Sequence, residues 1–203
     1  MARPREFDEL EVLDAAVECF RRHGLKASSM RDLSEATGIN QPSLYNAFGD
    51  KRALFRAALQ HYAATALRER LSRLEQSYAP KEAVRTFFHE LISRALSDPD
   101  LRGCMIVNAA IEAAPHDPAL RALIASYLEE IERFFLRALE KAAEAGELSP
   151  DLTPKDMARH FLGLLLGVRV AARAKPNRAL LEGMVRPALA LLDLPASPFR
   201  LQP

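Results

Sequence analysis

Apolar residues recur at intervals of three and four along most of the chain, the spacing that places them on one face of an α-helix. The first such segment carries an apolar stripe and is followed by Gly24, a residue type that often ends helices. No segment shows the sustained alternation of apolar and polar residues that marks a half-buried strand. The pattern therefore predicts helices throughout. The expected helices span about 7–23, 30–37, 41–48, 51–77, 81–97, 104–114, 117–145, 154–174 and 178–192.

Composition favours the same fold class. Of 203 residues, 34 are Ala and 31 are Leu, whereas Val, Ile and Thr together number 17, so strong helix formers far outnumber strand formers. We expect an all-α fold of about nine helices, with an N-terminal three-helix domain at 1–56 and a larger helical domain at 57–195. Residues 196–203 are expected to form a disordered tail. Pro187 is expected to bend or break the last helix.

The second and third helices are both about two turns long, and only the short Gly-containing stretch TGIN joins them. Such a turn between two short helices is typical of the helix-turn-helix motif. In the third helix, Leu44 and Phe48 are four residues apart and are expected to point into the core. The opposite face is polar and is expected to be displayed rigidly outward, where a DNA major groove could receive it.

The residue types on and near this face match DNA chemistry. Glutamine can form two hydrogen bonds with adenine, proline can touch a thymine methyl group, and free N–H groups at a helix start favour phosphate. The candidate contacts are Gln41 and Pro42 to bases, Ser43 and Asn46 to bases or sugars, Tyr45 and Lys51 to phosphates, Arg31 to guanine, and Ser28 and Ser29 to phosphates. Simple helix capping is the alternative for the two serines. For Arg31 the alternative is a surface charge or a phosphate contact, and for the others it is an ordinary solvated helix face.

Net charge adds no support for a nucleic-acid partner. The whole chain carries +1, and residues 1–56 hold nine Lys and Arg against nine Asp and Glu. A chain with this balance has no general attraction for polyanions. If the N-terminal domain binds DNA, the local arrangement of its basic groups must be responsible.

Three stretches within residues 12–59, FRRHG, SMRDLSEATGI and SLYNAFGDKRALF, resemble the DNA-binding head of the TetR family of transcriptional regulators. The resemblance implies base contacts by Arg31, Gln41, Pro42 and Ser43, and phosphate contacts by Tyr45 and Lys51. It also implies a homodimeric, ligand-responsive regulator, most simply a repressor, that binds a pseudo-palindromic double-stranded DNA operator and leaves it when an unknown small-molecule effector binds. The alternatives are a small-molecule binding protein, or an enzyme, whose head no longer binds DNA.

The last two helices are candidates for self-association. Gly163 and Gly167 are four residues apart, a spacing that allows close helix pairing, and the helix is too interrupted by arginines to cross a membrane. With the final helix it resembles the four-helix dimer interface of the family. The residues expected at this interface are Gly163, Leu164, Gly167, Val168 and Leu189.

The sixth helix is almost wholly apolar, which suggests burial, yet Cys104, Asn108 and Glu112 form one row at intervals of four. Such a row can line a ligand cavity, an interface or a strip of solvent. With Phe88 and Phe134 as apolar walls, it is the tentative effector site; plain core packing is the alternative for the two phenylalanines. A helix start and the nearby Arg102 favour the thiolate of Cys104, which predicts a reactive thiol. A buried, inert thiol is the alternative.

Several classes of protein are disfavoured. The two cysteines do not make a disulfide framework, and no stretch of 18 apolar residues or signal peptide was found. There is no P-loop, nucleophile elbow or dinucleotide fingerprint. Cys19 and His23 are four apart, but two ligands do not make a metal site. The expectation is a cytoplasmic, soluble protein without metal, cofactor or catalytic residues.

Overall fold

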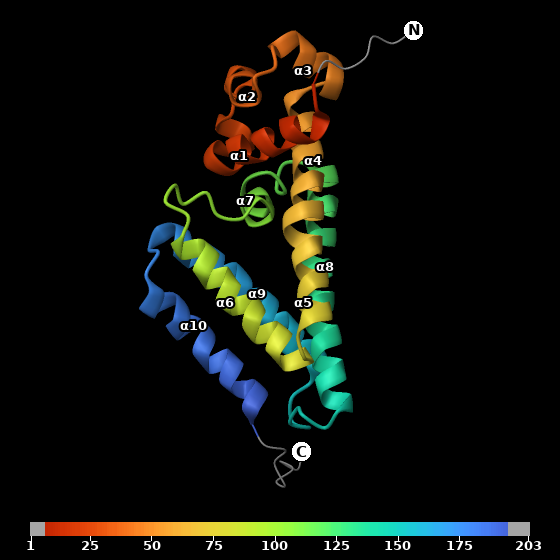
Figure 1. The fold of residues 1–203 in the computed structure, drawn as a ribbon, viewed down its shortest axis with the longest axis vertical. Coiled ribbons are helices and arrows are strands. Elements are labelled where there is room, and N and C mark those ends of the chain that lie inside the picture. The colour runs from red at the N-terminus through yellow and green to blue at the C-terminus, as the bar shows by residue number, and fades with distance from the viewer. Residues whose placement is uncertain (1–6, 195–203) are drawn as a thin grey trace. The chain divides into compact units, whose positions relative to one another are not determined.

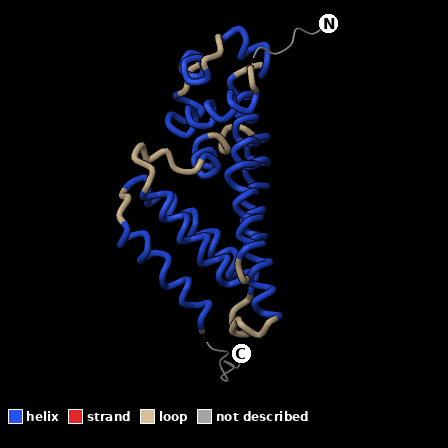
Figure 2. Tube along the Cα trace, in the orientation of Figure 1, coloured by secondary structure: helices blue, strands red, loops and turns tan. Residues whose placement is uncertain are grey.

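The computed structural model describes residues 7–194, and within this range every regular element is helical (Figure 2). This confirms the predicted all-α fold. The segment expected to be a disordered tail, 196–203, lies outside the described residues. The elements are α1 (Glu9–Ala27), α2 (Met30–Thr37), α3 (Gln41–Phe48), α4 (Lys51–Tyr62), η1 (Ala63–Arg68), α5 (Glu69–Ser77), α6 (Pro80–Leu96), α7 (Met105–Glu112), α8 (Pro118–Glu144), α9 (Pro154–Ala174), α10 (Arg178–Ala190) and η2 (Leu191–Asp193).

Within the described range, the contacts divide the chain into two compact units. The first, here called the head unit, comprises residues 7–69 and 104–124. The second, here called the body unit, comprises residues 70–103 and 125–194. The head unit is thus larger than the N-terminal domain expected at 1–56. It takes in α7 because this helix packs on α1, from which it is far removed in sequence.

The core of the head unit forms around α1, which lies between α7 and the α2–α3 pair (Figure 1). Phe20 of α1 meets Phe55 of α4 edge to face, with ring centroids 4.9 Å apart. Leu33 of α2 and Leu44 of α3 are also fully buried, and α2 packs on α1 while α3 packs on α2 and α4. Two helices too short to be stable alone are therefore held by their inner faces.

Local capping chemistry sets the boundaries of the short helices. The side chain of Asn40 accepts a hydrogen bond from the Ser43 N–H at the start of α3, and Asp50 does the same for Ala53 at the start of α4. Gly38 ends α2 with φ of 71°, a left-handed conformation that glycine adopts without strain. These caps explain why the bounds of α2 and α3 match the sequence prediction.

The core of the body unit is an aromatic cluster. Phe87 and Phe88 of α6 meet Phe134 and Phe135 of α8 and Phe161 of α9 with ring centroids 5.0–5.7 Å apart. All five rings are buried. Contacts of this kind add to the free energy gained from burying each ring.

A buried charge lies beside this cluster. Arg70 is 7% exposed, stacks over the Phe87 ring, and donates hydrogen bonds to Glu90 and to the Phe87 carbonyl oxygen. Burial, followed by repulsion from Arg94, lowers the pKa of Arg70 to about 10. Arg73 donates a hydrogen bond to the other carboxylate oxygen of Glu90, so the Glu90 carboxylate accepts from both Arg70 and Arg73.

The structure differs from the predicted helix pattern at three places. The first helix does not end at Gly24: helical turns continue to Ala27 after a kink at that residue. The long fourth helix is interrupted by the π-helical turn η1. α10 continues past Pro187 to Ala190, so the expected break is absent. Pro187 and Gly183, whose carbonyl would otherwise accept the missing N–H, are both exposed, so water can satisfy that carbonyl.

Candidate nucleic-acid interface

The outer face of α3 is a small exposed surface presented by a well-packed helix. Gln41, Pro42, Tyr45 and Asn46 are all exposed, Tyr45 to 46%, whereas Leu44 on the opposite side is fully buried. This division arises because residues three and four apart share one side of a helix. The structure thus brings four of the predicted DNA contacts together on one face. Ser43 is half-buried, and its backbone N–H serves the Asn40 cap.

The start of α2, a helix that packs on α3, carries two further candidates. Ser29 caps α2, and Asp32 accepts hydrogen bonds from the Ser29 backbone and hydroxyl, which hold the pKa of Asp32 below its ordinary value. Arg31 is 80% exposed and pairs with Glu35 at 2.9 Å. An exposed pair of this kind is weak. The Arg31 guanidinium can therefore exchange Glu35 for another acceptor at low cost.

Ser28 does not belong to this exposed surface. Its side chain is buried, with 1% of the residue accessible, and its hydroxyl donates to the Gly24 carbonyl oxygen at 2.6 Å. A buried hydroxyl cannot reach a phosphate group. The predicted phosphate contact by the Ser28 side chain is therefore wrong, and the hydroxyl instead ties the kink of α1 to the turn before α2.

Lys51 is half-buried in the first turn of α4. Its ammonium group donates to the Ser28 carbonyl oxygen at 2.6 Å and lies 3.4 Å from the Lys26 carbonyl oxygen. An ammonium group has three donors, so one remains for a phosphate. Sequence reasoning assigned only the phosphate contact to Lys51 and missed its bonds to the backbone.

The residues predicted for an effector site are distributed over both units. Phe88 and Phe134 have no accessible surface and belong to the aromatic cluster of the body unit, so neither walls an open cavity. Cys104 precedes α7, half-buried, with no hydrogen bond from its side chain to the helix start. Arg102, the cation expected to favour its thiolate, is paired with Asp98 and Asp100.

The other two members of that row lie on α7 in the head unit. Asn108 and Glu112 are both half-buried. The carboxylate of Glu112 accepts hydrogen bonds from the backbone N–H groups of Leu25 and Lys26, at 3.1 Å and 2.5 Å. The charged end of this row therefore binds the protein's own backbone, which speaks against a contact between Glu112 and an effector.

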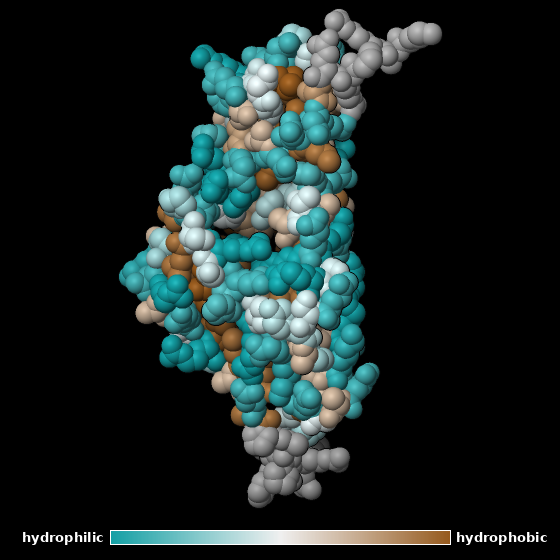
Figure 3. All heavy atoms as spheres, in the orientation of Figure 1, coloured by the Kyte–Doolittle hydropathy of each residue, from teal (hydrophilic) through white to brown (hydrophobic). Residues whose placement is uncertain are grey.

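The body unit has a cleft between α6 and α10 that the sequence analysis did not find. Its volume is about 430 Å³. Ile92, Val185 and Leu189 supply its apolar lining. In the orientation of Figure 1, brown apolar atoms form a strip over the region of α6 and α10 (Figure 3). The cleft is thus an apolar depression on the surface of the body unit.

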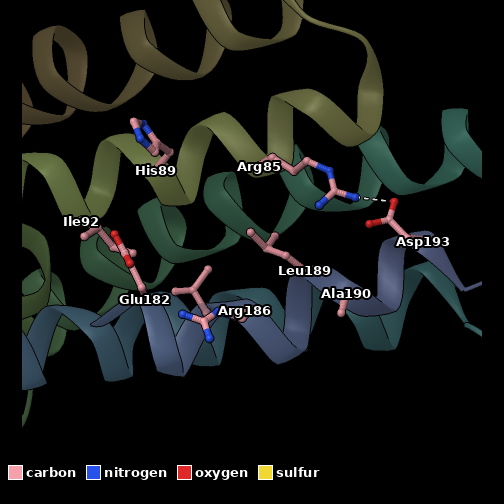
Figure 4. A pocket seen from close by; sticks show the side chains of 9 residues that line it. Arg85, His89, Ile92, Glu182, Arg186, Leu189, Ala190 and Asp193 are labelled. Carbon is pink, nitrogen blue, oxygen red and sulfur yellow. Dashed lines mark hydrogen bonds and ion pairs between the residues drawn. The ribbon is translucent and has the colours of Figure 1, made fainter. Parts of the chain in front are cut away.

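Charged and polar side chains border this cleft (Figure 4). Arg85 of α6 reaches across to Asp193 at 2.5 Å, while His89, Arg186 and Glu182 complete the border. In the sequence, this border corresponds to two pairs of polar residues spaced four apart. Arg85 and His89 form the pair on α6, and Glu182 and Arg186 form the pair on α10. This signal was overlooked because such pairs are common on solvated helix faces.

α9 and α10 also present an exposed apolar surface. Val170 is 51% exposed and Leu180 39%. Of the predicted interface residues, Gly163 is exposed and Leu164 and Gly167 are half-buried. A Cβ at residue 167 would lie 3.5 Å from the Met184 side chain of α10, so this glycine already faces the neighbouring helix of the same chain.

The remaining two predicted interface residues are placed differently. Val168 has no accessible surface within the protomer, and Leu189 lines the cleft between α6 and α10. The prediction of Val168 as a direct dimer contact is therefore wrong, because a side chain already buried in its own chain cannot meet a second copy.

A membrane-spanning role finds no support in these helices. Within residues 7–194, none combines the length and the apolar character needed to cross a bilayer.

The N-terminal and C-terminal parts of this chain each match the model of a known protein family. Residues 12–58 match the family model described as bacterial regulatory proteins, tetR family, and residues 80–187 match the model described as tetracyclin repressor-like, C-terminal domain. The uncharacterised HTH-type transcriptional regulator YezE of Bacillus subtilis (strain 168) is 34% identical over 195 residues, which is 95% of this chain and 100% of that protein. The HTH-type transcriptional repressor ComR of Escherichia coli (strain K12) is 28% identical, covering 84% of this chain and 82% of that protein.

Among solved structures, the TetR family regulator CifR, as a cysteine mutant complexed with a 26-base-pair operator, is similar to this chain with a TM-score of 0.82. The identity is 34%, and the match covers 93% of this chain and 98% of CifR. These matches extend over nearly the full length of the chain, and they agree with the exposed α3 face and the capped helix-turn-helix. The chain therefore belongs to the TetR family and is a DNA-binding transcriptional regulator.

Proposed function

We propose that this regulator docks α3 in the major groove of its operator and acts as a repressor that an effector releases. Support comes from the single exposed face of Gln41, Pro42, Tyr45 and Asn46, held in place by the buried Leu44. Gln41 lies in the first turn of α3, where a side chain can reach a base edge. Tyr45, one turn later, has its hydroxyl available for a phosphate.

Two copies of this head would read a pseudo-palindromic site. In a two-fold symmetric dimer, the recognition helices fit successive major grooves about 34 Å apart. The exposed apolar surface of α9 and α10 supports self-association through these helices. The family resemblance supports a homodimer as well.

Selection of binding sites from random DNA tests the docking. Gln41→Ala is expected to cost about 1–3 kcal/mol of binding free energy per half-site and to relax one base position in each half-site. The matched control is Gln60→Ala, an exposed glutamine of α4 outside the α3 face, which should leave the selected motif unchanged. An unchanged motif for Gln41→Ala would show that α3 is docked differently.

For the effector, the cleft between α6 and α10 is the site that we propose. A volume of about 430 Å³ is in the range of small-molecule sites. Within residues 7–194, the side chains of His89 and Arg186 have no hydrogen-bond or ion-pair partner. The apolar lining and these basic groups favour an effector with an apolar portion and an anionic group.

A larger side chain in the cleft tests this site. Leu189→Trp should fill the cleft and abolish thermal stabilisation by medium-chain carboxylates such as octanoate, with operator affinity retained. Tyr78→Trp, at an exposed residue before α6 that does not line the cleft, is the control and should keep the response. If octanoate stabilises neither the wild type nor the variants, the proposed ligand chemistry is wrong.

The regulator is proposed to work in the cytoplasm, where bacterial operators lie, and without catalysing a reaction. The family assignment supports both proposals. A gel shift with the DNA upstream of its own gene separates this function from the alternatives, a small-molecule binding protein or an enzyme with an inactive head.

A further inference from the structure

Glu112 joins two parts of the head unit that are 86 and 87 residues apart in sequence. One carboxylate oxygen accepts a hydrogen bond from the Leu25 N–H, and the other accepts from the Lys26 N–H. Hydrogen bonds between backbone N–H groups and a carboxylate are among the stronger ones in proteins. Both oxygens of a half-buried side chain are thus committed to the end of α1.

These two N–H groups need an acceptor because of Gly24. With φ of 80° and ψ of 176°, Gly24 interrupts the helical hydrogen-bond ladder of α1. The turn that follows therefore begins like a new helix, whose first N–H groups have no carbonyl to bind. Glu112 supplies the missing acceptors, and its negative charge suits a helix start.

Gly24 and Glu112 also fit each other sterically. A Cβ at residue 24 would overlap an oxygen of the Glu112 carboxylate and lie 3.0 Å from its Cδ. The positive φ at Gly24 independently disfavours any other residue. The pair therefore depends on both members: the glycine creates the free donors and leaves room for the carboxylate that binds them.

The turn that Glu112 holds also carries parts of the proposed DNA-binding surface. The carbonyl oxygens of Lys26 and Ser28 accept from the Lys51 ammonium group, and the Ser28 hydroxyl donates to Gly24. Ser29, the next residue, caps α2. The Glu112 carboxylate thus supports the backbone from which both Lys51 and the first turn of α2 are positioned.

We propose that Glu112 is a positioning residue for operator binding, and that α7 contributes to DNA binding by the head unit through this residue. This inference rests on the operator binding proposed above and goes beyond it, since Glu112 lies far from the α3 face in sequence and contacts no DNA itself. Loss of the carboxylate releases the turn after Gly24, which frees Lys51 from its place and weakens binding.

The test is Glu112→Gln in the full-length protein, with operator binding measured by fluorescence anisotropy at several salt concentrations. Glutamine keeps the shape but presents an N–H₂ group to one of the two backbone donors. Operator affinity is expected to fall by about tenfold or more. The slope of log Kd against log salt concentration is expected to decrease by about two, because each protomer of the proposed dimer loses one phosphate contact. Glu140→Gln, an exposed glutamate of α8, should change neither quantity.

Two further measurements separate positioning from a loss of folded protein. Amide hydrogen exchange at Leu25 and Lys26 should become faster in Glu112→Gln, while exchange in the centre of α1 stays slow. In a double-mutant cycle, Gly24→Ala should weaken binding less in a Glu112→Ala background than in the wild type, because the steric overlap is gone.

The possible results distinguish a failure of the positioning role of Glu112 from a failure of the proposed function. Wild-type affinity and salt slope in Glu112→Gln would overturn the positioning role, even if Gln41→Ala still changes the selected motif. A wild-type protein that binds no operator would instead overturn the proposed function. Weaker binding with unchanged exchange at Leu25 and Lys26 would also overturn the proposed mechanism.

Discussion

The ammonium nitrogen of Lys51 lies 2.6 Å from the carbonyl oxygen of Ser28, so the first turn of α4 is bonded to the turn that leads into α2. A side chain expected to bind phosphate is therefore also part of the fold of the head. Removing the Lys51 side chain should therefore affect both DNA binding and the stability of the head unit.

Lys51→Ala is accordingly expected to weaken binding to all DNA sequences alike and to lower the melting temperature, because a hydrogen bond from a charged donor to a half-buried carbonyl is lost. The stability cost should be about 1–3 kcal/mol. Binding to operator and to random DNA, together with thermal unfolding, measures both effects. Lys155→Ala on α9 is the control. A change in base preference, rather than a uniform loss, would contradict the role assigned to Lys51.

The apolar surface of α9 and α10 predicts a dimer that one charge can disrupt. Val170→Asp places a carboxylate where a second copy would bury it without a partner, and the dimer should dissociate in sedimentation experiments. Ile111→Asp is the matched control, since Ile111 is 67% exposed but lies on α7. A Val170→Asp protein that sediments as a stable dimer would place the interface elsewhere.

The two cysteines should react at different rates. Cys19 is buried, and burial raises the pKa of its thiol, which lowers the population of the reactive thiolate. Cys104 is half-buried and should be labelled faster by iodoacetamide in the folded protein. Mass spectrometry of the labelled peptides gives both rates. If Cys104 also acts as a sensor, alkylation should release the wild type from DNA and leave Cys104→Ser bound; equal, slow labelling of both thiols would rule this out.

Glu90 predicts how stability depends on pH in the acid range. Burial alone would raise its pKa, but the hydrogen bond from Arg73 and the charge of Arg70 outweigh burial and hold the pKa below its ordinary value of 4.5. The unfolded chain therefore takes up this proton more readily than the folded one. The stabilisation is fully present above pH 4.5 and is lost as the pH falls through the folded-state value.

Glu90→Gln should consequently be less stable than the wild type at pH 7, and the difference should shrink on acidification. Urea unfolding at a series of pH values measures it. Glu129→Gln, on an exposed part of α8, serves as the control. A stability difference that is the same at every pH would mean that Glu90 contributes through packing rather than through its charge.

Most of the head could be predicted from sequence because its boundaries depend on local chemistry. Asn40 and Asp50 cap the helices that directly follow them, and Gly38 ends the helix before it. The outward face of α3 follows from the same short-range pattern, since Leu44 must point inward. Such features need only neighbours within one or two turns.

The features that were not predicted depend on partners distant in sequence. Gly24 was expected to end a helix, whereas it forms a kink whose donors bind Glu112. The polar row that ends at Glu112 was predicted to line a ligand cavity, an interface or a strip of solvent, and it could not show that the Glu112 carboxylate faces the Leu25 and Lys26 backbone. Likewise, Ser28 is a typical capping residue by type, and only the fold places its hydroxyl on the Gly24 carbonyl oxygen.

The packing of α7 on α1 has a consequence for chimeric regulators. The family model for the C-terminal domain starts at residue 80 and includes α7, yet this helix belongs to the head unit. A head excised before residue 70 and grafted onto another body would leave Glu112 behind. The backbone N–H groups of Leu25 and Lys26 in the grafted head would then need an acceptor from the corresponding helix of the new body. Grafts that carry a matching glycine and glutamate are expected to keep operator affinity, and the junction would have to be chosen by this pair rather than by the domain boundary in the sequence.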